Sequence, residues 1–230
     1  RPRDRKGRGV PRVCEEMRFS VVLGTRPEIV KMSPVVRELQ RTRHDFDLVH
    51  TGQHYSFDMD KVFFRDLELP EPAVNLEVGS GTHGAQTGRM LAGLEAFFQS
   101  SRPDMVLVQG DTNTVLAGAL AAVKLGIPVG HVEAGLRSFD RSMPEETNRV
   151  LADHASDLLF APTETSARNL RAEGIPEERI FVTGNTIVDA VRENLQLARD
   201  KGDALAKLGV SKGRYILATL HRQENVDSRE

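Results

Sequence analysis

The 230 residues include 31 basic and 33 acidic side chains, which give a formal net charge of −2, and 39% of them are apolar. This balance provides no broad positive field for nucleic acid or for an anionic membrane surface, while the apolar content is enough for a sizeable core. Cys14 is the single cysteine, which excludes an internal disulfide framework and a cysteine-rich metal site. One cysteine fits a reducing compartment, so we expect a cytoplasmic protein. No apolar run reaches the roughly 18 residues that a membrane-spanning helix needs, so we expect no membrane partner.

The first sixteen residues differ in composition from the rest. They are rich in Arg, Gly and Pro and have no apolar periodicity. We expect residues 1–16 to be a disordered or artefactual extension ahead of Met17. A nucleic-acid-binding arm is the alternative, but the cations are dispersed and no aromatic residue lies among them.

From Phe19 onward an apolar strand, a turn and an amphipathic helix alternate along the chain. This alternation predicts parallel β-α-β units with right-handed crossovers, and therefore an α/β fold with a Rossmann-like doubly wound parallel sheet. Strands are predicted at 19–24, 46–52, 73–76, 105–110, 127–133, 157–162 and 179–184, and helices at 29–42, 58–67, 84–98, 114–125, 145–156, 165–173 and 187–199.

The pattern predicts one complete domain and the start of another. We expect a first Rossmann-like domain over 17–186 and a helix with a polar linker over 187–213. A new apolar strand, Tyr215–Thr219, would then open a second, incomplete Rossmann-like domain over 214–230. The turn at Gly184–Thr186 would lie near the hinge between the two domains.

The first strand-to-helix turn has the features of an anion site. In Gly24-Thr25-Arg26-Pro27-Glu28, Pro27 is suited to the first helical turn, backbone N–H groups precede it, and Arg26 adds positive charge. An ordinary helix start with a solvated Arg is the alternative. Neither the G-x-G-x-x-G dinucleotide loop nor the G-x-x-x-x-G-K-[ST] loop occurs here, so we expect neither NAD nor ATP as a cofactor.

Polar residues also follow the second and fourth predicted strands. Asp111 comes directly after one strand, and Gln53 and His54 come after the other. Asp111 could simply cap the following helix, because Asp is common at that position. The repeated placement of polar groups at strand ends favours a shared ligand site at one edge of the sheet.

His131 and Glu133 are two residues apart at the end of the fifth predicted strand. This spacing predicts that both point to the same face, which is half of a metal site. Further ligands are missing, since His83 and His154 are scattered along the sequence. We therefore expect no metal and predict that Glu133 acts directly.

Two acidic residues begin the next helix. Glu145 and Glu146 follow Pro144, and their simplest role is to complement the helix dipole. Arg149 could pair with either of them. In the functional interpretation Glu145 faces inward and Glu146 outward.

Later in the chain, His221 would face a cleft between two domains, with a solvated loop residue as the alternative.

Seven segments together resemble the non-hydrolysing UDP-N-acetylglucosamine 2-epimerases, particularly archaeal members. The similarity extends from Arg18 to Glu230. The segments are GTRPEIVKMSP at 24–34, HTGQH at 50–54, QGDTNTVLAGALAA at 109–122, GHVEAGLRSFDRSMPEETNR at 130–149, APTETSARNL at 161–170, FVTGNTIVDA at 181–190 and LHRQEN at 220–225.

The resemblance implies the glycosyltransferase-B architecture, in which two Rossmann-like domains enclose a cleft. It implies interconversion of UDP-GlcNAc and UDP-ManNAc, a UDP-sugar as ligand, no cofactor, and a homodimer in the full-length protein. Much of the diphosphate site of such enzymes belongs to the second domain, so the resemblance implies that this chain is inactive alone. Matched positions imply catalytic roles for Asp111, Glu133, Glu145 and His221, and substrate binding by Arg26, Lys31, Gln53, His54 and Arg137.

Some features depart from the bacterial pattern. The loop from Arg137 to Pro144 is shorter and lacks a Tyr-Ser-Pro run, and Ser56 and Ser80 replace residues that contact a second, activating UDP-GlcNAc in some bacterial members. We therefore expect no activation of that kind. A sister family inverts the same carbon of UDP-2,3-diacetamido-2,3-dideoxyglucuronate, but Thr25 and Glu28 favour the GlcNAc enzyme. A glycosyltransferase of the same architecture is a more distant alternative.

The chemistry that the resemblance implies is an elimination. C2 of the sugar has no adjacent carbonyl, so a base removes the proton from C2 while UDP leaves C1, and UDP adds back to 2-acetamidoglucal after protonation from the other face. This route needs carboxylates on two faces of the sugar and cations beside the leaving diphosphate. Asp111, Glu133 and Glu145 match the first need, and Arg26 and His221 match the second.

Overall fold

The computed structural model describes residues 17–42, 44–53, 57–200, 202 and 204–218. The chain divides into two units, residues 1–193 and 194–230, and the first contains the sheet and the candidate site. The predicted second domain begins within the second unit, and its boundaries stay a prediction. No helix in the described ranges has both the length and the apolar character needed to cross a bilayer.

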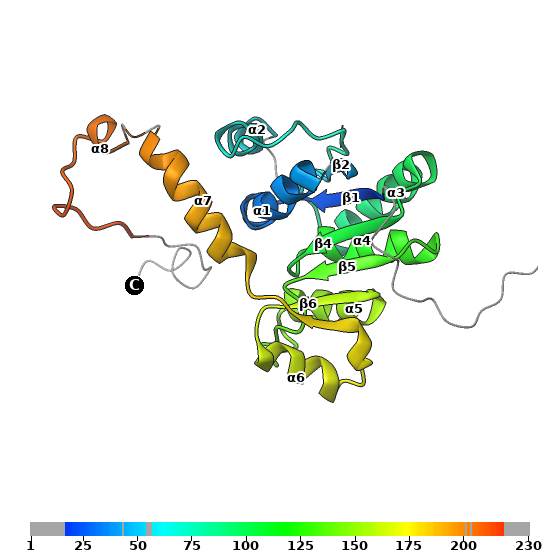
Figure 1. Cartoon of the computed structure of the whole chain (residues 1–230). Coiled ribbons are helices and arrows are strands. Elements are labelled where there is room, and N and C mark those ends of the chain that lie inside the picture. Colours follow the sequence, from blue (N-terminus) through cyan, green and yellow to red (C-terminus); the bar gives the residue numbers. More distant parts are fainter. Residues whose placement is uncertain (1–16, 43, 54–56, 201, 203, 219–230) are drawn as a thin grey trace, which may run out of the picture. The chain divides into compact units, whose positions relative to one another are not determined.

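A parallel sheet organises the first unit (Figure 1). Its order is β3-β2-β1-β4-β5-β6-β7, so the direction of winding reverses between β1 and β4. In doubly wound sheets ligands bind at the carboxyl ends of the strands beside such a reversal. The strands are β1 Arg18–Leu23, β2 Asp45–His50, β3 Val74–Asn75, β4 Met105–Gln109, β5 Val129–Val132, β6 Leu158–Ala161 and β7 Ile180–Val182.

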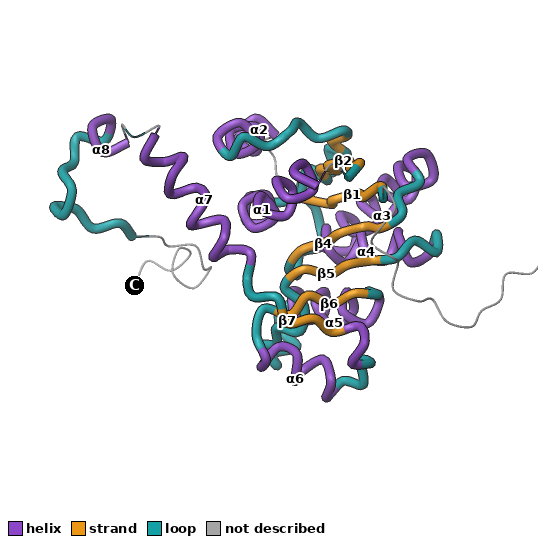
Figure 2. The backbone as a smooth tube through the Cα atoms, viewed as in Figure 1, coloured by secondary structure: helices purple, strands orange, loops and turns teal. Residues whose placement is uncertain are grey.

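Helices connect the strands in the predicted alternation, which Figure 2 shows as purple helices around orange strands. The prediction of a Rossmann-like parallel α/β fold is confirmed. The helices are α1 Arg26–Thr42, α2 Phe57–Asp66, α3 His83–Ser101, α4 Asn113–Lys124, α5 Pro144–Ala155, α6 Glu164–Ala172, α7 Thr186–Asp200 and the short α8 Ala204–Lys207.

The core has two principal layers because strand side chains alternate between the two faces of the sheet. Along β1, Val22 packs into a cluster with side chains of α3 and α4. Its neighbours Val21 and Leu23 point the other way and pack with side chains of α1 and α2. This double coverage explains why the central strands are nearly continuous apolar runs, as expected for a parallel sheet buried on both faces.

The predicted strand at Tyr215–Thr219 does not form in its described part. Residues 215–218 have no regular secondary structure, and Ile216 and Leu217 are exposed. A strand is stabilised by hydrogen bonds to a neighbouring strand, and in the described residues none pairs with this segment. Its apolar composition was therefore not sufficient to specify a strand here.

Candidate functional site

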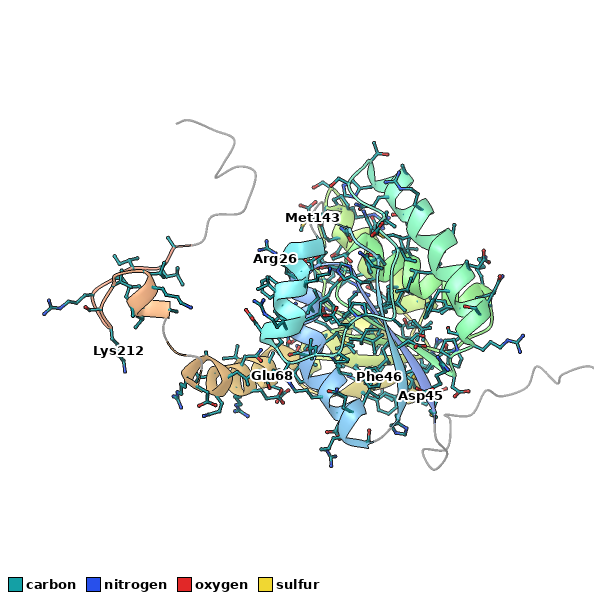
Figure 3. The ribbon with its side chains drawn as sticks, turned by 90° about the horizontal axis from the view of Figure 1, so that it is seen from above. Arg26, Asp45, Phe46, Glu68, Met143 and Lys212 are labelled. Atoms are coloured by element: carbon teal, nitrogen blue, oxygen red, sulfur yellow. The ribbon has the colours of Figure 1, made fainter. Side chains whose placement is uncertain are left out.

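The candidate site lies at the carboxyl edge of the sheet, where loops after β1, β2, β4 and β5 present polar side chains. Figure 3 shows Arg26 near one end of the sheet and Asp45 and Phe46 near the other. Arg26 is exposed, with its guanidinium 6.0 Å from the centre of the Phe63 ring. Gln53 accepts a hydrogen bond from the Thr114 hydroxyl at 2.9 Å. Two predicted residues, His54 and His221, lie outside the described residues.

The Glu133 carboxylate is held by two donors, one from a helix and one from the end of a strand. Lys31 Nζ of α1 lies 2.8 Å from one carboxylate oxygen, and Gln109 Nε2 at the end of β4 lies 3.2 Å from the other. The Glu133 side chain is 10% exposed, so it is shielded yet reachable. The structure therefore brings together Lys31 and Glu133, two of the predicted site residues.

The prediction that His131 and Glu133 share one face is wrong. Glu133 lies just beyond the end of β5 and has a left-handed backbone with φ of 70°, which breaks the strand alternation. Its side chain turns to Lys31, whereas the buried His131 contacts Asp153 and the Gly110 carbonyl. No three His, Cys, Asp or Glu side chains in the described ranges are grouped so that they could hold a metal ion.

Asp111 is positioned by residues of α5. Its carboxylate forms an ion pair with Arg149, and its backbone carbonyl accepts a hydrogen bond from Asn148 Nδ2 at 2.9 Å. The alternative role as helix cap does not apply, because Thr112 is the N-cap of α4 and accepts from the Val115 N–H. With its side chain 33% exposed, Asp111 can meet a ligand at the sheet edge.

Glu146 rather than Glu145 is the buried residue of the pair. Its carboxylate accepts hydrogen bonds from the Ser138 N–H and hydroxyl and from the Phe139 N–H. Burial alone would raise the pKa of Glu146, but these hydrogen bonds and the charge of Arg149 outweigh it and lower the pKa. The expectation that Glu146 faces outward is therefore wrong, since it anchors the loop before α5. Glu145 is partly exposed beside it.

Arg137, in the loop after β5, pairs with two carboxylates of the protein. Its guanidinium lies 2.7 Å from Asp153 and 2.6 Å from Glu173, and its side chain is 1% exposed. Both partners are protein carboxylates, so the observed role of Arg137 is to join α5 to the end of α6. The substrate-binding role of Arg137 stays a prediction.

Glu28 is a site residue whose structural role was not predicted. It is fully buried and accepts hydrogen bonds from the Gly24 N–H at 2.5 Å, the Thr25 N–H at 2.9 Å and the Thr112 hydroxyl at 2.5 Å. It thereby links the loops after β1 and β4, on the two sides of the winding reversal. The signal in the sequence was the spacing of Thr25 and Glu28, which matches a helix capping box.

The Glu28 carboxyl is expected to make stability depend on pH. Burial raises its pKa to about 7, although hydrogen bonds from Thr112, Gly24 and Thr25 act to lower it. A folded-state pKa above the unfolded value gives a contribution that is present below pH 4.5 and is lost as pH rises through about 7. We expect a loss of at most about 3 kcal/mol over this range, measured by urea unfolding.

Glu28→Gln is expected to remove this pH-dependent loss, because the amide does not titrate. Glu95→Gln on the exposed part of α3 provides a matched control that should keep it. An equal loss between pH 5 and pH 8 in the Glu28 variant would contradict the assignment.

Comparison with known proteins adds to this geometry. A family model described as UDP-N-acetylglucosamine 2-epimerase matches residues 37–230. The chain belongs to this family. It is 58% identical over 216 residues to the UDP-N-acetylglucosamine 2-epimerase of Methanocaldococcus jannaschii, with 93% of the chain and 59% of that protein covered. A crystal structure of the M. jannaschii enzyme in complex with UDP-GlcNAc and UDP superposes with a TM-score of 0.87.

More distant relatives are also similar. The UDP-2,3-diacetamido-2,3-dideoxy-D-glucuronate 2-epimerase of Pseudomonas aeruginosa is 42% identical, with 92% of the chain and 59% of that protein covered. The MurG structure of Acinetobacter baumannii, 13% identical with a TM-score of 0.54, shares the fold. The chain spans about three-fifths of the length of the curated epimerases that it matches.

Proposed function

We propose that the full-length protein interconverts UDP-N-acetylglucosamine and UDP-N-acetylmannosamine by inverting C2. The observation that carries this proposal is the placement of Asp111 and Glu133 on loops after adjacent strands beside the winding reversal, each held by a cation, Arg149 or Lys31. The similarity to the M. jannaschii enzyme, whose crystal structure contains UDP-GlcNAc and UDP, supports the choice of substrate. The product would supply ManNAc-type sugars for cell-surface polysaccharide or glycan synthesis.

The proposed route is elimination followed by re-addition. C2 carries an acetamido group and has no adjacent carbonyl, so removing its proton alone gives no stabilised enolate. A carboxylate therefore takes the proton as the C1–O bond to UDP breaks, which leaves 2-acetamidoglucal and UDP. Protonation of C2 from the opposite face and attack of UDP on C1 complete the inversion. The electrons of the C2–H bond form the double bond, so no redox cofactor is required.

Three carboxylates are available for the two proton transfers. Asp111 or Glu133 would act as the base, and Glu145 would assist in returning the proton because it lies in the first turn of α5, on a separate segment of the chain. Donors to both Glu133 oxygens fix the orientation of that carboxylate before the substrate arrives. Arg26 would contact the diphosphate at the start of α1, where the helix dipole favours negative charge. His221 would add to the diphosphate site from a second domain.

The alternative substrate is UDP-2,3-diacetamido-2,3-dideoxyglucuronate. The higher identity to the M. jannaschii enzyme than to the P. aeruginosa enzyme favours UDP-GlcNAc. Assays with both nucleotide sugars distinguish the two, since the glucuronate carries a carboxylate and a second acetamido group that the site must accommodate.

The decisive experiment is to incubate the full-length protein with UDP-GlcNAc in D2O. Deuterium at C2 together with UDP-ManNAc is the expected result. Free UDP and ManNAc would instead indicate a hydrolysing enzyme. If neither deuterium at C2 nor UDP-ManNAc is detected, the proposal is overturned. The homodimer and the cytoplasmic location stay predictions.

A further inference from the structure

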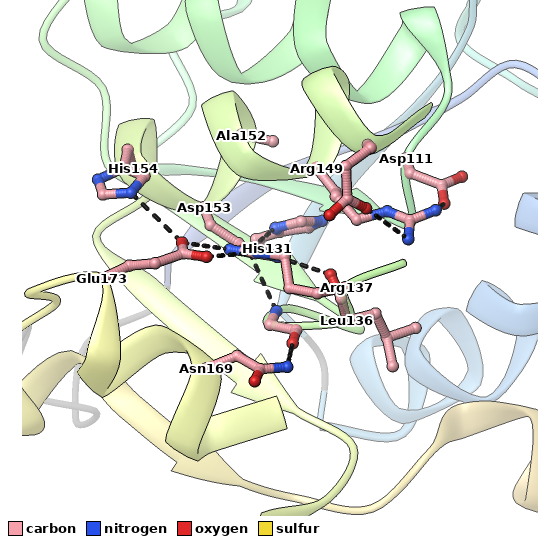
Figure 4. A network of polar contacts seen from close by, with 12 residues as sticks. Asp111, His131, Leu136, Arg137, Arg149, Ala152, Asp153, His154, Asn169 and Glu173 are labelled. Carbon is pink, nitrogen blue, oxygen red and sulfur yellow. Dashed lines mark hydrogen bonds and ion pairs between the residues drawn. The ribbon is translucent and has the colours of Figure 1, made fainter. Parts of the chain in front are cut away.

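His131 lies in a buried site where both of its ring nitrogens meet acceptors. Nδ1 is 2.7 Å from Asp153 Oδ1 on α5, and Nε2 is 2.8 Å from the carbonyl oxygen of Gly110 after β4. The His131 and Asp153 side chains are both 0% exposed. Figure 4 shows His131 beside Asp153, with Arg149 and Asp111 on the other side of the ring.

The chemistry of these partners determines the charge of the ring. A carbonyl oxygen can only accept, so Nε2 must carry a proton. Asp153 Oδ2 accepts from the Gly135 N–H at 3.1 Å and lies 2.7 Å from the Arg137 guanidinium, which favours an ionised carboxylate. An ionised carboxylate also only accepts, so Nδ1 must carry a proton as well. Both nitrogens are therefore donors, and the ring is an imidazolium.

The surrounding charges balance this cation. Asp153 faces His131 from α5 and Arg137 approaches from the loop after β5, while Glu173 at the end of α6 pairs with Arg137 and lies 3.5 Å from His154. Burial alone would lower the pKa of His131. The charge of Asp153 and the hydrogen bonds to Asp153 and Gly110 outweigh both burial and repulsion from Arg137, and they raise it.

The Gly110–Asp111 turn is held at three successive points from β5 and α5. His131 binds the Gly110 carbonyl, Asn148 binds the Asp111 carbonyl, and Arg149 pairs with the Asp111 carboxylate. Gly110 has a φ of 88°, a conformation that glycine adopts without strain. Loss of the His131 bond would remove the contact directly before Asp111 and leave the turn held only by Asn148 and Arg149.

We propose that His131 is maintained as a buried imidazolium that fixes the Gly110–Asp111 turn, and that it is thereby a positioning residue for Asp111. The catalytic part of this inference rests on the proposed function, whereas the charge state does not. Deprotonation would place a lone pair against a carbonyl or a carboxylate, so His131 makes both of its hydrogen bonds only while the ring keeps both protons. The stabilising contribution is present below pH 6.5 and is lost as pH rises through the higher folded-state pKa.

Long-range ¹H–¹⁵N NMR of the histidine-labelled chain tests the charge state directly. We expect both ring nitrogens of His131 to remain protonated at pH 7, because each faces a hydrogen-bond acceptor. Through-bond assignment keeps this test independent of any variant. An unprotonated ring nitrogen of His131 at pH 7 would overturn the proposal, whether or not the full-length protein is an epimerase.

His131→Gln in the full-length protein tests the positioning role. A glutamine amide has a donor at one end and an acceptor at the other, so it cannot donate to both Asp153 and Gly110. We expect kcat to fall roughly 10- to 100-fold with little change in KM. Deprotonation of His131 at high pH should lower kcat of the original protein, and this alkaline decline should be absent in the variant. His44→Gln is the matched control and should retain the original kcat and its alkaline decline. Unchanged kcat in a folded His131 variant would reject the positioning role.

Discussion

Glu133→Gln in the full-length protein is expected to lower both kcat and deuterium incorporation at C2 by about 10²- to 10⁴-fold. The carboxylate is clamped by Lys31 Nζ at 2.8 Å and Gln109 Nε2 at 3.2 Å, so the substitution preserves shape while removing proton affinity. The amide NH2 group would also face one of these two donors. Mass spectrometry of the nucleotide sugars after incubation in D2O measures the exchange.

Two further variants show whether the loss of kcat and of exchange comes from removing the Glu133 carboxylate itself. Glu95→Gln makes the same substitution on the exposed part of α3 and should leave exchange at its original rate. Lys31→Met removes one of the two donors and should reduce kcat less than Glu133→Gln does, because the carboxylate is still present. Undiminished exchange in the Glu133 variant would remove this residue from the proton-transfer scheme.

Much of the fold could be predicted because local patterns and the tertiary environment agree. The apolar runs at Val21–Leu23 and Val106–Val108 are buried on both faces of a parallel sheet. The first is followed by the amphipathic helix α1 and the second by the largely buried helix α4. Polar residues directly after such runs must lie at the carboxyl edge. The approximate position of Asp111 therefore followed from the strand pattern, although the identity of the helix cap, Thr112, did not.

The detailed directions of the site residues depended on contacts between distant segments. A helix start at Pro144 cannot decide whether Glu145 or Glu146 is buried, because the decision comes from N–H groups of Ser138 and Phe139 in the preceding loop. A two-residue period predicted the direction of Glu133 only if the strand continued, and the strand ends at Val132.

Arg137 illustrates the same limit for charge. A cation in a motif beside acidic residues is typical of anion binding, and nothing local distinguishes a diphosphate from a carboxylate of the protein. The ion pairs with Asp153 and Glu173 exist because α5 and α6 bring these residues to Arg137. The sequence spacing alone therefore could not show that this guanidinium forms ion pairs with two carboxylates of the protein.

Asp153→Ala is expected to lower the free energy of unfolding by about 3–5 kcal/mol, because it leaves the His131 imidazolium and the Arg137 guanidinium buried with one partner fewer. Asp153 accepts from His131 and from the Gly135 N–H, and it lies 2.7 Å from Arg137. Asp153→Asn should cost less, since the amide oxygen can still accept one hydrogen bond. Urea unfolding at pH 7 measures both losses.

The pH dependence of the Asp153→Ala loss separates a charge effect from a packing effect. Burial would raise the pKa of Asp153, but His131 and Arg137 lower it, so its contribution is present above pH 3.8 and is lost as pH falls through the folded-state value. The His131 contribution is lost in the opposite direction, above pH 6.5. The difference in the free energy of unfolding between the original protein and the variant should therefore be largest between these limits and smaller on both sides.

Arg171→Ala, which removes surface ion pairs with Glu164 and Glu177, is the control and should leave the free energy of unfolding unchanged within error. A loss that is constant from acid to alkaline pH would instead mean that Asp153 acts through packing alone.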